Sequence, residues 1–141
     1  MNNTLTLTHR EACELVAHIQ AALEAQGKGA AIAVSDAHGE LIAFVRTDGC
    51  PLPSIYNAMN KAFTSAREGI PSKQLGEASR NENFPLTNFG DLRYIGWGGG
   101  MPLKAGDDVV GAIGVSGLPE AEDVELVKLG VDYFQKEILG K

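Results

Sequence analysis

The chain has 141 residues, a length that suits one domain whose hydrophobic core needs no disulfide or metal to fold. Its hydrophobic fraction of 44% and charged fraction of 21% are typical of a globular protein and exclude a disordered one. Its net charge of −6 disfavours binding to nucleic-acid phosphates and to anionic membrane surfaces. We therefore expect a single domain over residues 1–141, with neither nucleic acid nor a membrane as its partner.

The cysteines and the N-terminal segment indicate the cellular compartment of the protein. Cys13 and Cys50 have neither the spacing of a disulfide framework nor that of a C-x-x-C pair, although a lone disulfide stays an alternative. The N-terminal segment has no basic start followed by an apolar run, and no stretch of the chain is apolar for the length of a membrane-spanning helix. We expect reduced thiols and a cytoplasmic protein.

The first predicted element is a helix that begins after Thr8. Thr8 and Glu11 have the spacing of a capping box, in which each side chain accepts a hydrogen bond from the other residue's backbone. The apolar residues that follow recur as on one helical face: Ala12, Leu15, Val16, Ile19 and Leu23. Gly27 and Gly29 end this helix.

A β-hairpin and a second helix come next. Residues 31–36 and 41–46 have the composition of strands and flank the short turn 37–39, which predicts a hairpin. After a Pro- and Gly-bearing stretch, apolar residues at helical spacing predict a helix that starts at Ser54 and ends before Gly69.

The second half of the chain is less regular at first. We expect residues 72–92 to form a long packed loop with at most a helical turn from Ser72. Residues 93–97 have an extended pattern, residues 101–104 and 108–115 that of a hairpin, and residues 124–139 that of a helix. This order of elements predicts an α+β domain with an antiparallel sheet.

The 17 glycines concentrate in two segments, 96–100 and 111–117. Gly111 and Gly114, within a predicted strand, indicate either a helix packed closely on the sheet or a ligand pressed against the backbone. Gly98, Gly99 and Gly100 could direct successive backbone amides at a ligand oxygen, and at least one of them should need a positive φ. We place these three glycines and the adjacent Met101 in a ligand-binding site. The sequence contains neither of the usual glycine-rich phosphate-binding motifs.

Charged residues suggest a second part of the site. Arg46 can hold a carboxylate through two hydrogen bonds, Lys61 adds a positive charge, and Asp48 could orient either side chain. Asp48 and Lys61 are the candidate catalytic residues, since both can move a proton. The alternative is that Asp48 forms an ordinary surface ion pair with Arg46 or Lys61.

Histidine is scarce, which limits metal and haem chemistry to few positions. His18 flanks the apolar face of the first helix, where it could serve as the axial ligand of haem iron. The alternative is that it is simply exposed to solvent. Because the sequence has no Cys-x-x-Cys-His motif, any haem would be bound without a covalent link.

Several short motifs, in order along almost the whole chain, resemble the GlcG/HbpS-like family. This family is also called the haem-degrading domain family and includes the C-terminal domain of PduO. The matching segments are Val34-Ser35-Asp36 with Gly39, Phe44-Val45-Arg46-Thr47-Asp48-Gly49, Lys61-Ala62, Gly99-Gly100-Met101-Pro102, residues 111–117 and Asp123. The chain departs from the usual alanine after Asp-Gly, where it has Cys50, either a soft ligand or a small buried side chain.

The resemblance implies a profilin-like α+β fold, in which long N- and C-terminal helices pack on a five-stranded antiparallel sheet. It also implies assembly into homo-oligomers, dimers or higher. Some members are linked to haem, and others to operons for glycolate or diol breakdown. The shared motifs include the positions of Arg46, Asp48 and Lys61. They do not include His18, which is a candidate haem ligand only because an imidazole can bind haem iron.

Three functions follow from these observations. The first is a protein that binds haem, a related tetrapyrrole or another small ligand, with haem iron on His18 and a propionate on Arg46 or Lys61. The second is a catabolic enzyme or accessory factor for a small hydroxy acid or carbonyl compound, in which Arg46 binds a carboxylate and the glycine amides stabilise an oxyanion. The third is a non-catalytic assembly module.

Overall fold

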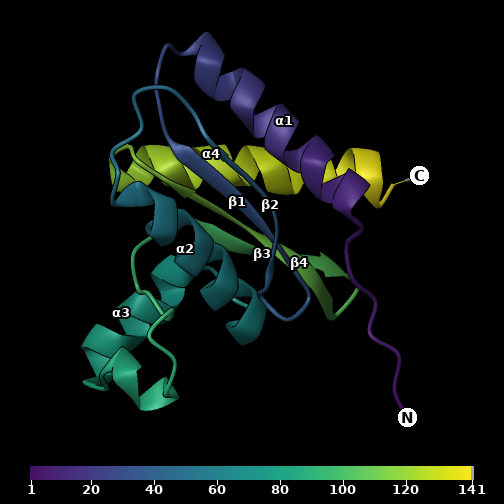
Figure 1. Ribbon diagram of the computed structural model, residues 1–141. Coiled ribbons are helices and arrows are strands. Elements are labelled where there is room, and N and C mark those ends of the chain that lie inside the picture. The colour runs from purple at the N-terminus through teal and green to yellow at the C-terminus, as the bar shows by residue number, and fades with distance from the viewer. Residues whose placement is uncertain (141) are drawn as a thin grey trace.

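The computed structural model describes residues 1–140, which form a sheet with helices on both faces (Figure 1). The helices are α1 His9–Ala25, α2 Ser54–Glu68, α3 Ser72–Glu82 and α4 Glu120–Tyr133, with a short 3₁₀ helix at Leu86–Phe89 and a π-helical end at Phe134–Ile138. The strands are β1 Ala31–Asp36, β2 Leu41–Arg46, β3 Gly100–Ala105 and β4 Asp108–Ser116.

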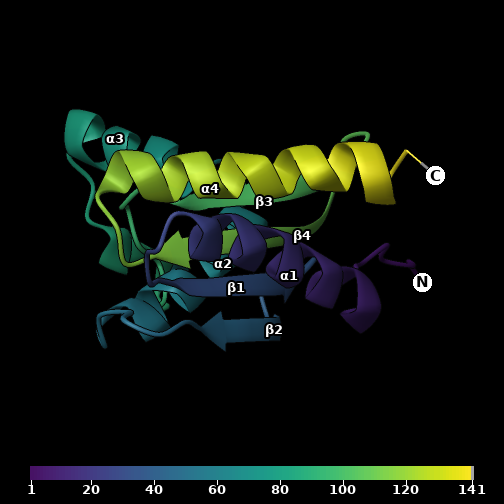
Figure 2. The same cartoon turned by 90° about the horizontal axis from the view of Figure 1, so that it is seen from above.

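The four strands form one antiparallel sheet in the order β2-β1-β4-β3. Helices α1 and α4 cover one face and α2 covers the other, as Figure 2 shows from above. Figure 1 shows α3 next to α2 and far from α1. The central strands β1 and β4 therefore have a helix on each side, and β4 carries the chain toward the loop that begins α4.

The two faces of the sheet carry side chains of different size. Large apolar residues of β1 and β4, including Ile32 and Val115, form the core under α1 and α4. The face toward α2 carries alanines and Gly114, where a Cβ would overlap the carbonyl oxygen of Ala58 in α2. Close packing of α2 therefore accounts for Gly114. A Cβ at Gly111 would instead meet the side chain of Leu7, which lies outside the helices.

The local signals in the first half of the sequence predicted these elements correctly. The capping box is present: the Glu11 amide donates to Thr8 Oγ1 at 3.2 Å, and the Thr8 amide donates to Glu11 Oε1 at 2.9 Å. Strands β1 and β2 have the predicted residues. Helix α2 starts at Ser54 and is capped after Glu68 by Gly69, which has a left-handed φ of 70°.

Three expectations for the second half were wrong. The sheet has four strands, not five, because residues 93–97 form no strand and the Ile95 amide donates to the Thr64 side chain at 3.0 Å. Residues 72–92 are not a long loop, because they contain α3 and the 3₁₀ helix. The last helix begins at Glu120, four residues before the predicted start.

No helix among the described residues is both long and apolar enough to cross a membrane.

Candidate functional site

A pocket of about 390 Å³ lies where α2, the glycine segment before β3 and the loop between β4 and α4 meet. Trp97 and Gly98, from the glycine segment, line it. The polar side chains that line it are Ser54, Asn57, Lys61, Ser116, Glu120 and Asp123. The pocket therefore has the size and the hydrogen-bonding groups to take a small polar molecule.

Lys61 and Asp123 form a buried ion pair in this pocket. Lys61 Nζ lies 3.4 Å from Asp123 Oδ2, and the two side chains are 3% and 4% exposed. Lys61 also donates to the Val115 carbonyl oxygen at 3.0 Å, and the other carboxylate oxygen of Asp123 accepts from the Leu118 amide at 3.1 Å. Both charged groups are therefore anchored to the end of β4 and to the loop that follows it.

Burial shifts the pKa values of both members of the pair toward the neutral forms. Desolvation lowers the pKa of Lys61, and the charge of Asp123 only partly restores it. Desolvation likewise raises the pKa of Asp123 against the opposing effect of Lys61. Compared with an exposed lysine, Lys61 therefore has a larger fraction of its amine unprotonated and able to act as a base or nucleophile.

The structure places the predicted glycine site at the edge of this pocket. Gly99 has a φ of 120°, which confirms that one of the three glycines needs a positive φ. The Gly98 amide donates to Glu120 Oε2 at 3.0 Å, and the Gly100 amide donates to Ser72 Oγ at 2.9 Å. Both amides therefore already have partners within the protein.

Met101 lies apart from the Lys61 pocket. It pairs with Ile113 in the sheet and packs against the core under α1 and α4, whereas Lys61 approaches from α2. Its side chain is thus directed to the opposite face of the sheet.

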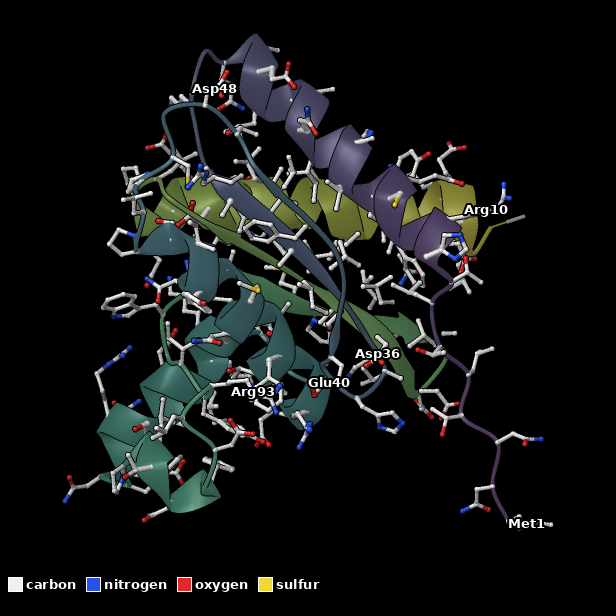
Figure 3. All side chains as sticks on the ribbon, in the orientation of Figure 1. Met1, Arg10, Asp36, Glu40, Asp48 and Arg93 are labelled. Carbon is white, nitrogen blue, oxygen red and sulfur yellow. The ribbon has the colours of Figure 1, made fainter. Side chains whose placement is uncertain are left out.

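Arg46 and Asp48 lie in a different pocket, of about 430 Å³, with Lys28 and Glu24. Figure 3 shows Asp48 at the end of the hairpin far from Asp36 and Glu40. Arg46 and Lys61 therefore line different pockets, and the buried partner of Lys61 is Asp123 rather than Asp48.

His18 lines a third pocket, of about 310 Å³, on the outer side of α1 and α4. Its ring stacks on Tyr133 with centroids 4.3 Å apart, and Leu129 and Lys136 lie in the same pocket. His18 is thus half-buried and accessible, but neither Arg46 nor Lys61 is beside it.

Charged residues of the first two pockets both affect the pKa of the Cys50 thiol. This thiol is half-buried, and desolvation raises its pKa, while Arg46 lowers it and Asp123 raises it further. It packs beside the alanine cluster under α2, and no group of three potential metal-ligating side chains occurs among residues 1–140. Its environment is that of a small, partly buried side chain.

Sequence reasoning missed most of the lining of the Lys61 pocket. Asp123 appeared only as part of a family motif, and Ser54, Trp97 and Ser116 were not assigned to a site. A weak signal was available, since Asp123 is an acidic residue in the first turn of a helix after a Gly-Leu-Pro loop. Its pairing with Lys61, 62 residues earlier, has no local signature.

Comparisons with known proteins agree with this architecture. The family model described as "Haem degrading protein HbpS-like" matches residues 7–132. Protein GlcG of Escherichia coli K12 is 29% identical over 116 residues, which cover 82% of this chain and 85% of GlcG.

Two solved structures have the same fold. The crystal structure of a double mutant of HbpS from Streptomyces reticuli has a TM-score of 0.84 at 26% identity, covering 94% of this chain and 89% of HbpS. A structure described as a PduOC:haem complex has a TM-score of 0.83 at 18% identity, covering 91% of this chain and 94% of PduOC. From its matched segment and its fold, the chain belongs to the GlcG/HbpS-like family.

Proposed function

We propose that the protein binds haem or a related tetrapyrrole in the pocket lined by His18. Membership of a family described as haem-degrading supports this proposal, as does the haem complex of the structurally similar PduOC. The observation that assigns the proposed haem site to particular residues is the accessible imidazole of His18, which lines the pocket and stacks on Tyr133.

The residues of this pocket suit a non-covalently held porphyrin. Imidazole is a strong axial ligand for haem iron, and Leu129 with the Tyr133 ring offers apolar surface to the macrocycle. The haem propionates need a cation as a partner. In this pocket Lys136 provides it, in place of Arg46 or Lys61, which line other pockets. Asp132 and Glu137 also line the pocket and would repel the propionates, which favours the orientation that directs them to Lys136.

Haemin titration of the purified protein, followed by the Soret band, tests the proposal. His18→Ala should shift the Soret band and weaken haemin binding, because the iron loses its axial ligand. Lys136→Gln should weaken binding but leave the Soret position unchanged, since it removes only a partner of the propionates. His38→Ala is the matched control, because His38 is exposed in the β1–β2 turn. Identical titrations for His18→Ala and the unmodified protein would exclude His18 as the ligand.

A second candidate function is the capture or conversion of a small hydroxy acid or carbonyl compound. The observation that favours it is the buried Lys61–Asp123 pair within a polar pocket of about 390 Å³. Lys61 and Asp123 would provide the base and acid of the reaction. In this function Arg46 and Asp48, which line another pocket, would act on a separate ligand or on none.

Fluorescence of Trp97, the single tryptophan, should report on occupancy of this pocket because Trp97 lines it. Titration with glycolaldehyde, or at higher concentration with glycolate, should change its emission in a saturable way. Lys61→Met should abolish that response, and Lys136→Gln should not. An unchanged emission with all small hydroxy and carbonyl compounds would count against the second candidate.

A further inference from the structure

We infer that Lys61 forms a covalent imine with a small uncharged hydroxyaldehyde or hydroxyketone in the pocket of about 390 Å³, with Asp123 as the acid that assists the loss of water. This inference rests on the second candidate function and is independent of haem binding at His18, which lines another pocket.

The position of Lys61 distinguishes it from a purely structural buried lysine. Lys61 lines the pocket, and its Nζ is 3.4 Å from Asp123 Oδ2, longer than the 2.7–2.9 Å that is usual for a tight ammonium–carboxylate hydrogen bond. A buried pair that only stabilises the fold needs a close contact to offset the desolvation of both charges. The loose pair at the pocket therefore leaves the amine available for another partner.

The backbone at Gly99 packs closely on the amine. A Cβ at this position would lie 2.9 Å from Lys61 Nζ and 2.6 Å from the Val115 carbonyl oxygen. The positive φ of Gly99 holds the chain in a conformation that other residues rarely adopt. A larger residue at this position would therefore displace the amine from its place beside Asp123.

The charges around the amine favour a neutral substrate. Asp123 and Glu120 both line the pocket and together outnumber the single positive charge of Lys61. The Gly98 amide and Lys73 contact Glu120 and compensate part of its negative charge. A carboxylate substrate would be repelled by these acids, whereas an aldehyde or ketone would not. Hydroxyl groups on the substrate could hydrogen-bond to Ser54, Asn57 and Ser116.

The protonation states required for imine formation agree with the shifts found for the pair. Burial lowers the pKa of Lys61, which increases the fraction of free amine, while Glu120 and Asp123 oppose this shift. Burial raises the pKa of Asp123, which increases the fraction that can donate a proton. An amine nucleophile and a carboxylic acid thus lie within one pocket.

The reaction needs no other reagent. The lone pair of Nζ attacks the carbonyl carbon, a C–N bond forms, and the π electrons of the carbonyl move to its oxygen, which takes one proton from Nζ. The C–O bond of this carbinolamine then breaks, and its hydroxyl leaves as water with a proton from Asp123. As the C=N bond forms, Nζ gives its remaining proton back to Asp123. One amine and one carbonyl group give one imine and one water, with no change in oxidation state.

Reductive trapping tests the inference on the full-length protein. The protein is incubated with glycolaldehyde and cyanoborohydride at neutral pH, and alkylated lysines are quantified by peptide mass spectrometry. Lys61 should be alkylated faster than the exposed Lys128, because burial lowers the pKa of Lys61 and so increases its fraction of free amine. Glyoxylate, an aldehyde that carries a carboxylate, should label Lys61 more slowly than glycolaldehyde does.

Two variants separate the roles of the pair. Asp123→Asn keeps the size of the side chain but removes its acid, and it also lowers the pKa of Lys61 further. Slower labelling of Lys61, with labelling of Lys128 unchanged, would therefore show that proton donation by Asp123 outweighs the gain in free amine. Lys128→Gln is the matched control and should leave the rate at Lys61 unaltered. Circular dichroism checks that both variants are folded. If Asp123→Asn does not fold, the ratio of Lys61 to Lys128 labelling in the unmodified protein tests imine formation at Lys61 by itself.

The outcomes distinguish this inference from the function on which it rests. If Trp97 fluorescence reports binding of glycolaldehyde but Lys61 is labelled no faster than Lys128, the covalent step is wrong and the second candidate function stands. If neither the emission nor the labelling of Lys61 responds, both are wrong.

Discussion

Lys61 on α2 and Asp123 on α4 meet as a buried ion pair, although these two helices cover opposite faces of the sheet. They make contact beyond the end of β4, where Lys61 also binds the carbonyl oxygen of Val115 and Asp123 binds the amide of Leu118. The pair therefore connects the two helical layers of the protein at the wall of its polar pocket.

Replacing Lys61 should destabilise the protein strongly. Lys61→Met removes the positive charge but keeps an unbranched side chain, which leaves the carboxylate of Asp123 buried without its partner. We expect the free energy of unfolding to fall by about 3–5 kcal/mol, as when other buried pairs are broken. Urea unfolding measures this loss, and Lys128→Met, at an exposed site, should change it by less than about 0.5 kcal/mol.

The loss in Lys61→Met should depend on pH. The pKa of Asp123 in the folded protein is already raised above 3.8 by burial, and removal of Lys61 raises it further. A raised pKa favours folding at low pH, and this contribution disappears as the pH rises through the folded-state pKa. The deficit should therefore be smaller at pH 5 than at pH 8 in urea unfolding. Lys61→Met/Asp123→Asn should show little of this dependence; an equal deficit for Lys61→Met at both pH values would contradict the assignment.

Gly99→Val should destabilise the protein and disrupt the pocket. The positive φ of Gly99 is unfavourable for a β-branched residue, and the new side chain would press on the Val115 carbonyl and on Lys61. We expect a loss of about 2–4 kcal/mol, since backbone strain and overpacking combine. Thermal unfolding measures it. Gly90→Asn is the control, because Gly90 has open space around it and asparagine tolerates its left-handed φ of 74°.

The capping box at the start of α1 should contribute to stability by itself. Thr8→Ala removes the side-chain oxygen that accepts from the Glu11 amide, which should reduce the free energy of unfolding by about 1 kcal/mol. Thr4→Ala in the exposed segment before α1 is the matched control. A loss for Thr8→Ala no greater than that of the control would show that α1 is held by its packing alone.

Self-association remains a prediction, and exposed apolar side chains support it. Leu52, just before α2, and Tyr56, in its first turn, are 67% and 72% exposed, and large exposed apolar groups favour an interface. Light scattering at micromolar concentration should give the mass of a dimer or a larger assembly. Tyr56→Glu should shift this mass toward the monomer if the start of α2 lies in the interface. A monomer for the unmodified protein would contradict the prediction.

Signals between residues close in the sequence predicted the first half of the fold. The Thr8–Glu11 capping box, the β1–β2 hairpin and the glycine end of α2 each depend on contacts within a few residues, and the structure has all three. Helix α3 was missed because only Ser72, Leu75 and Gly76 of its residues are buried, which leaves almost no apolar periodicity. It is held in part by the close approach of Gly76 to the backbone at Gly96, a contact that is tertiary.

In the candidate site, too, the sequence identified single residues and the tertiary structure decided how they are grouped. The sequence by itself determined the family through its ordered motifs and identified His18, Arg46, Lys61 and the glycine segment as residues of interest. Only the tertiary structure decided that His18, Arg46 and Lys61 line three different pockets and that Lys61 pairs with Asp123. The reason is physical: the energy of a buried charge depends on its burial and on its distance from other charges in space, and neither quantity follows from spacing along the chain.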